Sequence, residues 1–286
     1  MGAQMYRVGC STCNVFPDRA LFEAYREAGI SAMEVSLRRE GCAKLDFEEL
    51  RALSREYGVE LWSFHLPFLP FDALDPSNPA VAKQSVEYLS SLIESATSIG
   101  IQRIVIHASG EPIVEEDRGV RLQCAKESLA ALAELASSRG AVLAVENLPR
   151  TCIGRDSDDI LALLDAHPTM RVCFDTNHLL GEDAVRFIER VGDRIVTLHV
   201  SDYDFKNERH WIPGEGDADW SEILSSLQGV GYSGVWMYEV SLTAPATIVR
   251  QRELTLRDLA ENARALFAGE KPPFGGVRAE GLVSWK

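Results

Sequence analysis

The sequence has no long hydrophobic run. No stretch approaches the roughly 18 consecutive apolar residues that a membrane-spanning helix requires. The first ten residues, Met1–Cys10, also lack the charged region and the following apolar region of a secretory signal. We therefore expect a cytoplasmic protein with no membrane partner.

Positive charge is scarce. The chain has 29 Lys and Arg residues against 43 Asp and Glu residues, which gives a formal net charge of -14. Proteins that bind nucleic acid through its phosphates need Lys and Arg side chains to displace the counterions. The charge balance therefore predicts no nucleic-acid partner and disfavours any polyanionic ligand.

Paired cysteines and glycine-rich phosphate loops are also missing. The six cysteines are scattered over 286 residues, which favours reduced thiols over a disulfide framework. Cys10 and Cys13 have the spacing of a redox or zinc pair, but no second pair follows, so we interpret them as structural. No strand is followed by a Gly-x-Gly-x-x-Gly or Walker-type loop, which removes the usual signature of an open doubly wound sheet.

The sequence instead alternates short β-branched runs with amphipathic stretches, the pattern of repeated βαβ units. The predicted strands are Tyr6–Cys10, Ala32–Leu37, Glu60–His65, Arg103–Ala108, Val142–Asn147, Arg171–Asp175, Ile195–Ser201 and Val235–Val240. The predicted helices are Asp18–Glu27, Phe47–Tyr57, Pro79–Ile99, Arg118–Ser138, Ser157–Ala166, Asp183–Val191, Trp220–Gln228 and Thr247–Phe267.

Eight such units predict an α/β fold of one kind, a closed (β/α)8 TIM barrel. A barrel of this type takes about 250 residues as one domain, so we assign residues 1–268 to it. Residues 269–286 are rich in Pro and Gly and have neither helical nor strand periodicity. We expect them to form a short C-terminal extension.

Histidines and carboxylates gather where the predicted strands end. The residues at or just after a strand end are His65, His107, Glu146, Asp175, His178, His199 and Glu239. With His210 in the next loop, five of the six histidines fall at one end of the barrel, where barrel enzymes carry their active sites. A bound cation is the usual way to offset the cost of burying several carboxylates together, so the pattern predicts a divalent metal site.

The donor types leave the metal open. Imidazole and carboxylate without thiolate suit manganese, magnesium, cobalt, iron or zinc.

Five segments carry a resemblance to a known superfamily. They are VEN at 145–147, FDTNH at 174–178, LHVSD at 198–202, HWIPGEGDADW at 210–220 and YEV at 238–240. Together they resemble the xylose isomerase-like TIM barrels, which include ketose 3-epimerases, hydroxypyruvate isomerase, inosose dehydratase and zinc-dependent abasic-site endonucleases. The resemblance runs from the first strand to the eighth and implies a small sugar, keto acid or cyclitol as substrate.

The ketose 3-epimerase pattern implies a role for each residue that matches it. It implies one metal ion on Glu146, Asp175, His199 and Glu239, with Glu146 and Glu239 as the acid and base. These two carboxylates would remove and return a proton beside a carbonyl of the substrate, and the metal would stabilise the enediolate that forms, which is the chemistry of a sugar epimerase or isomerase. The substrate contacts that we expect around this site are His65, His107, His178, His210, Glu34 and Trp211. For Glu34, the alternative is a salt bridge at the rim with Arg38 or Arg39.

Three other functions stay open. A cyclitol dehydratase would use the same metal and carboxylates. A phosphodiesterase of the abasic-endonuclease kind would use His65, His107, His178 and His210 for further zinc ions. Its Asp-x-His motif appears here as Glu208-Arg209-His210, which puts the third zinc site in doubt. A sugar-binding barrel without catalysis is disfavoured because both glutamates are present.

The sequence contains only weak signals for the phosphorylation state of the substrate and for the oligomeric state of the protein. No glycine-rich phosphate loop follows the last two strands, which favours an unphosphorylated substrate. The long loop at residues 66–79 could form a lid or an interface, so a homo-oligomer is left open.

Overall fold

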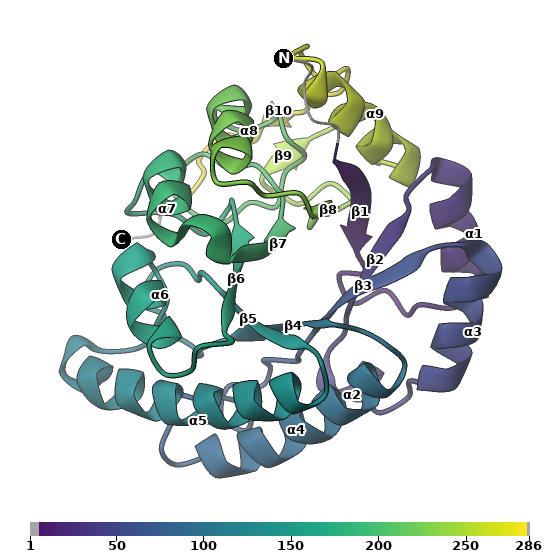
Figure 1. Cartoon of the computed structure of the whole chain (residues 1–286). Helices are drawn as coiled ribbons and strands as arrows, with labels where there is room; N and C mark the ends of the chain where they lie inside the picture. Colours follow the sequence, from purple (N-terminus) through teal and green to yellow (C-terminus); the bar gives the residue numbers. More distant parts are fainter. Residues whose placement is uncertain (1–5, 285–286) are drawn as a thin grey trace.

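The computed structural model describes residues 6–284, so the start of Met1–Cys10 and the end of the predicted extension lie outside the described residues. Eight parallel strands form one sheet with helices around it (Figure 1). The strands are β1 (Arg7–Ser11), β2 (Ala32–Ser36), β3 (Glu60–His65), β4 (Arg103–His107), β5 (Val142–Glu146), β6 (Arg171–Asp175), β7 (Ile195–His199) and β8 (Val235–Tyr238). All eight predicted strands are present.

The sheet closes on itself. β1 pairs with β2 on one side and with β8 on the other. Between β8 and β7, the amide of Val200 donates to the carbonyl of Met237 at 2.8 Å, and the amide of Glu239 donates to the carbonyl of Val200 at 3.1 Å. The (β/α)8 barrel predicted from the sequence is therefore confirmed.

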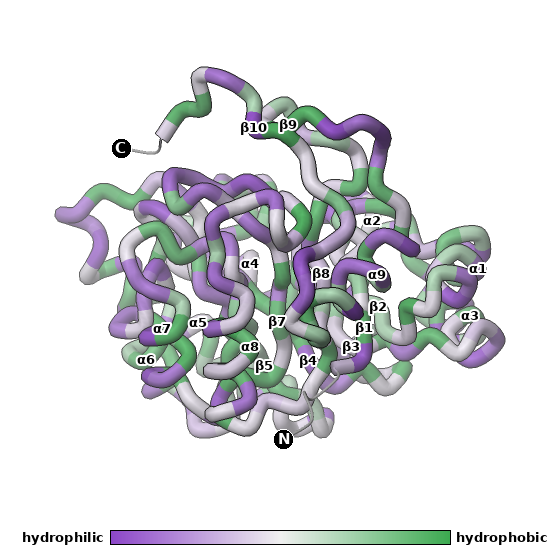
Figure 2. Tube along the Cα trace, turned by 90° about the horizontal axis from the view of Figure 1, so that it is seen from above, coloured by the Kyte–Doolittle hydropathy of each residue, from purple (hydrophilic) through white to green (hydrophobic). Residues whose placement is uncertain are grey.

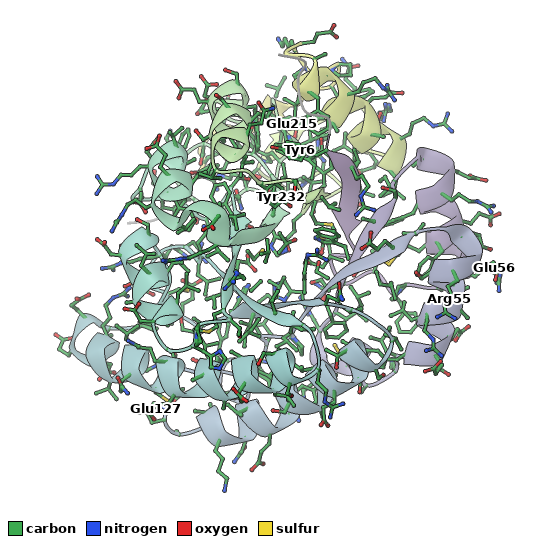
Figure 3. All side chains as sticks on the ribbon, in the orientation of Figure 1. Tyr6, Arg55, Glu56, Glu127, Glu215 and Tyr232 are labelled. Carbon is green, nitrogen blue, oxygen red and sulfur yellow. The ribbon has the colours of Figure 1, made fainter. Side chains whose placement is uncertain are left out.

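Helices cover the outside of the barrel. They are α1 (Arg19–Ala28), α2 (Arg39–Cys42), α3 (Phe47–Tyr57), α4 (Ala82–Ser98), α5 (Arg118–Ser138), α6 (Ser157–Leu164), α7 (Ala184–Val191), α8 (Trp220–Gly229) and α9 (Leu256–Phe267). Charged side chains such as Arg55 on α3 and Glu127 on α5 lie on their outer faces (Figure 3). Each of α1, α3, α6, α7 and α8 begins after an aspartate whose carboxylate accepts from the first turn.

The lower part of the barrel is filled with side chains. Trp62 on β3 packs with Val235 and Met237 of β8, and its indole N–H donates to Thr197 Oγ1 on β7 at 3.1 Å. At Gly9, a Cβ atom would lie 2.6 Å from Val235 Cγ1, so only glycine fits beside this plug. The predicted site residues lie at the opposite end of the barrel, which we call the upper end, where the strands terminate.

The last helix and the tail differ from the prediction. The helix expected from Thr247 begins only at Leu256, after a capping box formed by Thr255 and Asp258. The residues before it contain β9 (Ile248–Val249), which pairs antiparallel with β10 (Val277–Arg278) in the tail. Figure 2 shows β9 and β10 side by side at one end of the barrel, at the top of the view. The sequence missed β10 because two residues carry no periodicity.

Across residues 6–284, no helix combines the length and the apolar character that a membrane crossing would need.

Candidate metal centre

Four residues predicted as metal ligands meet at the upper end of the barrel. Glu146, Asp175 and His199 are the last residues of β5, β6 and β7, and Glu239 directly follows β8. One ligand atom from each lies within 4.8 Å of the others. We call these four residues the buried cluster.

The interior of the buried cluster is rich in negative charge. His199 Nδ1 lies 3.2 Å from Glu146 Oε1, 3.5 Å from Glu239 Oε2 and 3.8 Å from Asp175 Oδ2. Within residues 6–284, Asp175 Oδ2 and His199 Nδ1 are buried without a hydrogen-bond partner, and no Lys or Arg pairs with the cluster. Unsatisfied oxygen and nitrogen atoms that converge in this way fit a divalent cation.

The electrostatics of the carboxylates agree with this interpretation. Burial, together with the negative charges of Glu239 and Glu146, raises the pKa of Asp175 well above its usual value. Burial would also raise the pKa of Glu146, but the neighbouring His199 and His107 hold it well below its usual value. A cation placed among these groups would remove the repulsion that Asp175 experiences.

Glu34 orients His199 from the side away from the cluster. Its side chain is fully buried; Oε1 lies 2.9 Å from His199 Nε2, and Oε2 accepts from Ser63 Oγ at 2.8 Å. The alternative of a rim salt bridge with Arg38 or Arg39 is wrong. A carboxylate at Nε2 leaves Nδ1 free for a cation, the arrangement common behind metal-binding histidines.

Two further histidines flank Glu146. Oε2 of this residue lies 3.1 Å from His65 Nε2 and 3.2 Å from His107 Nε2. The Phe68 ring stacks on His107 with ring centroids 4.0 Å apart. His65, Glu146 and His199 also bring one ligand atom each within 4.8 Å of the others, so Glu146 and His199 belong to both groups of donors.

A second group of donors lies nearer the solvent and adjoins the buried cluster, because His178 Nδ1 lies 3.3 Å from Glu146 Oε1 and 3.6 Å from Asp175 Oδ2. His178, Glu208 and His210 bring one ligand atom each within 4.8 Å of the others, and we call them the outer cluster. His178 Nε2 lies 2.8 Å from Glu208 Oε1, and Glu208 also pairs with Arg150. The glutamate that replaces aspartate in the Asp-x-His motif therefore lies close to both histidines.

Trp211 is not brought to the clusters. It is fully buried, and its indole N–H donates to Thr247 Oγ1 at 2.9 Å. The loop around it is held by buried hydrogen bonds. Asp202 accepts from Gly214 N at 2.7 Å and from the Trp220 indole at 3.0 Å. A Cβ atom on Gly216 would lie 2.0 Å from Asp202 Oδ1. The HWIPGEGD segment thus serves mainly to hold this loop in place. Its first residue, His210, belongs to the outer cluster.

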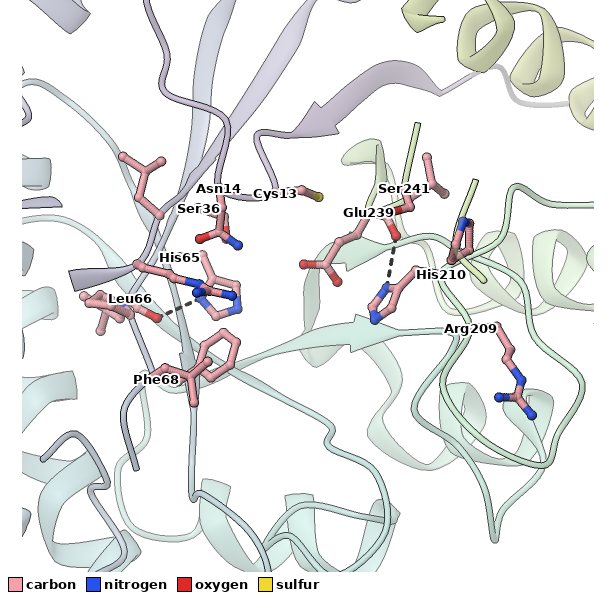
Figure 4. Close-up of a pocket in the computed structure, with 16 residues that line it drawn as sticks. Cys13, Asn14, Ser36, His65, Leu66, Phe68, Arg209, His210, Glu239 and Ser241 are labelled. Carbon is pink, nitrogen blue, oxygen red and sulfur yellow. Dashed lines mark hydrogen bonds between the residues drawn. The ribbon is translucent and has the colours of Figure 1, made fainter. Parts of the chain in front are cut away.

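Two adjoining cavities open above the buried cluster. One, of about 350 Å³, extends over the ends of β1 and β2, and the other, of about 220 Å³, extends over β4 to β6. They share His65, Phe68, His210 and Glu239. In Figure 4, His65 and Phe68 face Glu239 and His210 across the larger cavity. Together the cavities form a groove with the acidic centre at its middle.

Several lining residues were missed by the sequence analysis. Arg150 pairs with Glu111 and Glu208 across the smaller cavity. Cys13, Asn14 and Arg38 line the larger one. These residues lie in the loops that follow β1, β2 and β5, and that position was the signal that could have identified them. Their residue types alone do not indicate a site.

Cys10 has no site role in this arrangement. Its thiol is buried, and burial raises its pKa to about 12, so it is not a reactive thiolate at neutral pH.

Comparison with known proteins places the chain among barrels of this kind. A family model described as "Xylose isomerase-like TIM barrel" matches residues 22–265. An uncharacterized protein of Mycobacterium leprae (strain TN) is 26% identical over 289 residues, covering 90% of this chain and 96% of that protein. Full-length similarity thus extends to a protein of no stated activity.

Two relatives with named activities match shorter segments. Fructoselysine 3-epimerase of Escherichia coli O157:H7 is 27% identical over 147 residues, or 49% of this chain and 52% of that protein. A probable endonuclease 4 of Bacillus licheniformis is 27% identical over 183 residues, or 58% of this chain and 59% of that protein. The chain thus spans only part of each of these two.

The fold itself matches a solved structure of L-ribulose 3-epimerase with a TM-score of 0.76. That match is 21% identical and covers 92% of this chain and 94% of the other. At this identity it establishes the barrel and not the substrate.

Proposed function

Because this chain belongs to the xylose isomerase-like TIM barrel family, we propose that it is a divalent-metal-dependent sugar isomerase or epimerase. The observation that carries the proposal is the buried cluster, with Glu146 and Glu239 both at the edge of the cavities. Named epimerases among the relatives and the similar structures support the same reaction class.

The chain's own residues would divide the work as follows. Glu146, Asp175, His199 and Glu239 would hold the cation, which, when bound, supplies charge stabilisation to adjacent substrate oxygens. One of Glu146 and Glu239 would remove the proton beside the carbonyl, and the other would return a proton to the opposite face or to the neighbouring carbon.

The remaining histidines would position the substrate. His65, His107, His178 and His210 line the smaller cavity together with Glu146 and Glu239. Imidazole nitrogens suit the hydroxyl groups of a small sugar, keto acid or cyclitol. Phe68, which stacks on His107, would exclude water from that side of the cavity.

The donor set also bears on the metal. Three carboxylates and one imidazole form an oxygen-rich site, which suits manganese or magnesium better than zinc, and cobalt is the next choice. We propose one such ion per chain.

The direct test combines elemental analysis with solvent deuterium exchange. The purified protein would be incubated in deuterium oxide with a panel of ketoses, hydroxypyruvate and inososes. We expect one metal per chain and deuterium at a carbon beside the carbonyl, and the exchange should be much slower in Glu239→Gln. A metal-free protein that binds no added divalent ion would overturn the proposal.

A second function has one specific observation in its favour. The outer cluster provides the donors of a further metal ion, as an abasic-site phosphodiesterase would need, and an endonuclease 4 is among the relatives. Against it, the positive charge of Arg150 already pairs with Glu208. Three zinc ions per chain and cleavage of an abasic duplex, without deuterium exchange, would favour this second function.

A further inference from the structure

Arg38 lines the larger cavity without a partner of its own. It lies two residues beyond the end of β2, its side chain is exposed, and no other described residue forms an ion pair or hydrogen bond with its guanidinium. The same cavity is lined by Glu239 and His65. A ligand held at the buried cluster can therefore extend toward a free guanidinium.

Neighbouring arginines are engaged elsewhere. Arg209, which also lines this cavity, is buried and donates to Asp204 Oδ2 at 2.9 Å. Arg39 lies over the Tyr88 ring at 4.7 Å. Arg150 pairs with two carboxylates. Among the arginines that border the groove in residues 6–284, Arg38 is thus the one with its donors unused.

Uncommitted polar groups line the same cavity. Asn14, Ser36 and Ser241 all border it, and their side chains make no hydrogen bond to another described residue. An apolar stretch of the loop after β3, from Leu66 to Leu69, also lines this cavity. The cavity of about 350 Å³ falls within the range of about 300–1,000 Å³ typical of ligand sites.

We propose that Arg38 binds an anionic group on the substrate, a carboxylate or a phosphate, remote from the reacting carbon. A chain of net charge -14 repels an anionic ligand at long range, so a local cation is needed to hold one. The planar guanidinium binds either anion through two parallel hydrogen bonds. Asn14 and Ser36 complete the subsite with an amide and a hydroxyl.

This inference rests on the proposed function, since it concerns the substrate of that site. It narrows the substrate class to acidic sugars, and it predicts that a neutral ketose binds more weakly than its acidic counterpart.

The test is calorimetric binding to the manganese-loaded protein of three ketoses that differ only at C6. The probes are D-fructose, D-fructuronate and D-fructose 6-phosphate, with the corresponding D-tagatose series as a second panel. We expect one of the two anions to bind at least about tenfold more tightly than the neutral sugar. The tighter of the two anions identifies the group as a carboxylate or a phosphate.

Variants assign the effect to Arg38. Arg38→Met, which keeps the aliphatic stem, should remove the preference for the anion and change the binding of the neutral sugar less than about twofold. Arg38→Lys should restore part of the preference, because charge is retained without the planar fork. Arg39→Met is the matched control on the neighbouring residue and should leave the preference intact.

The two proposals can fail separately. Anion preference that depends on Arg38, without deuterium exchange in any sugar, would sustain the subsite and reject the isomerase. Deuterium exchange in neutral ketoses would sustain the isomerase. If the parent protein then showed no preference for the anion, or if Arg38→Met kept the same preference as the parent, the subsite alone would be rejected.

Discussion

The buried and outer clusters contain similar residue types in different surroundings. In the buried cluster, Asp175 Oδ2 and His199 Nδ1 have no hydrogen-bond partner within residues 6–284. In the outer cluster, Glu208 contacts both His178 and Arg150, and the pKa of Glu208 is held well below its usual value. Burial alone would raise that pKa, but His178 and Arg150 more than offset it.

The difference shows that proximity of donors is a weak criterion for a metal site. The guanidinium of an arginine can neutralise a carboxylate as a metal ion does, and the carboxylate then needs no metal ion for its charge. Among the described residues, imidazoles are the only basic side chains beside the carboxylates of the buried cluster, and one of them is His178 of the outer cluster. We therefore expect the first metal ion to bind there.

The largest expected effect separates the two clusters by catalysis. Glu239→Gln removes a proposed proton acceptor and a metal ligand, and should lower the rate of deuterium exchange about 10²–10⁴-fold. Glu208→Gln, the matched change in the outer cluster, should lower it less than about tenfold. The measurement is the initial exchange rate by NMR at saturating manganese. Equal losses in both variants would break the comparison.

Metal binding should also stabilise the fold. At a free metal concentration about 100 times the dissociation constant, linkage gives about 2.7 kcal/mol in the free energy of unfolding. Thermal denaturation with and without chelator measures it, and Tm should fall when the metal is removed. The gain should disappear in Asp175→Asn and persist in Glu208→Gln. A gain that follows Glu208 would place the ion in the outer cluster.

A smaller effect should come from Glu34, which touches His199 from behind. Glu34→Gln keeps the side-chain shape but removes the negative charge 2.9 Å from His199 Nε2, so manganese affinity should fall about 10–100-fold. Competition with a fluorescent chelator measures the affinity. Glu40→Gln, an exposed change on α2, is the control. Unchanged affinity in Glu34→Gln would reduce this residue to a structural role.

Much of the architecture could be predicted from the sequence, because barrel strands and helices carry local periodicity. His65, His107, Glu146, Asp175 and His199 were all expected at strand ends, and each is the last residue of its strand. Parallel strands bring such residues to one edge of the barrel whatever their separation in sequence.

What the sequence could not supply depends on pairings between distant segments. The contacts of Glu34 with His199 and of Arg150 with Glu208 join loops and strands far apart in the chain. Trp211 was predicted to contact substrate, but it turns instead toward Thr247. Its orientation follows from the burial of the loop around Asp202, which has no local pattern.

The smallest expected effect is on metal binding by the outer cluster when Arg150 is replaced. Arg150→Met removes the positive charge beside Glu208 while keeping much of the aliphatic volume. His178, Glu208 and His210 would then face one another without a competing cation, and affinity for a second divalent ion should rise about tenfold. Elemental analysis after dialysis against zinc should find two ions per chain in this variant and one in the parent.

The control for this change is Arg19→Met. Arg19 is exposed, pairs with Glu56 and is the first residue of α1, on the outside of the barrel. A second zinc ion that appears in Arg150→Met and is lost again in the double variant with His210→Ala would assign it to the outer cluster. A second ion already present in the parent protein would mean that Arg150 does not exclude it. The contrast between the clusters would then rest on burial alone, since the outer donors would bind metal despite the adjacent guanidinium.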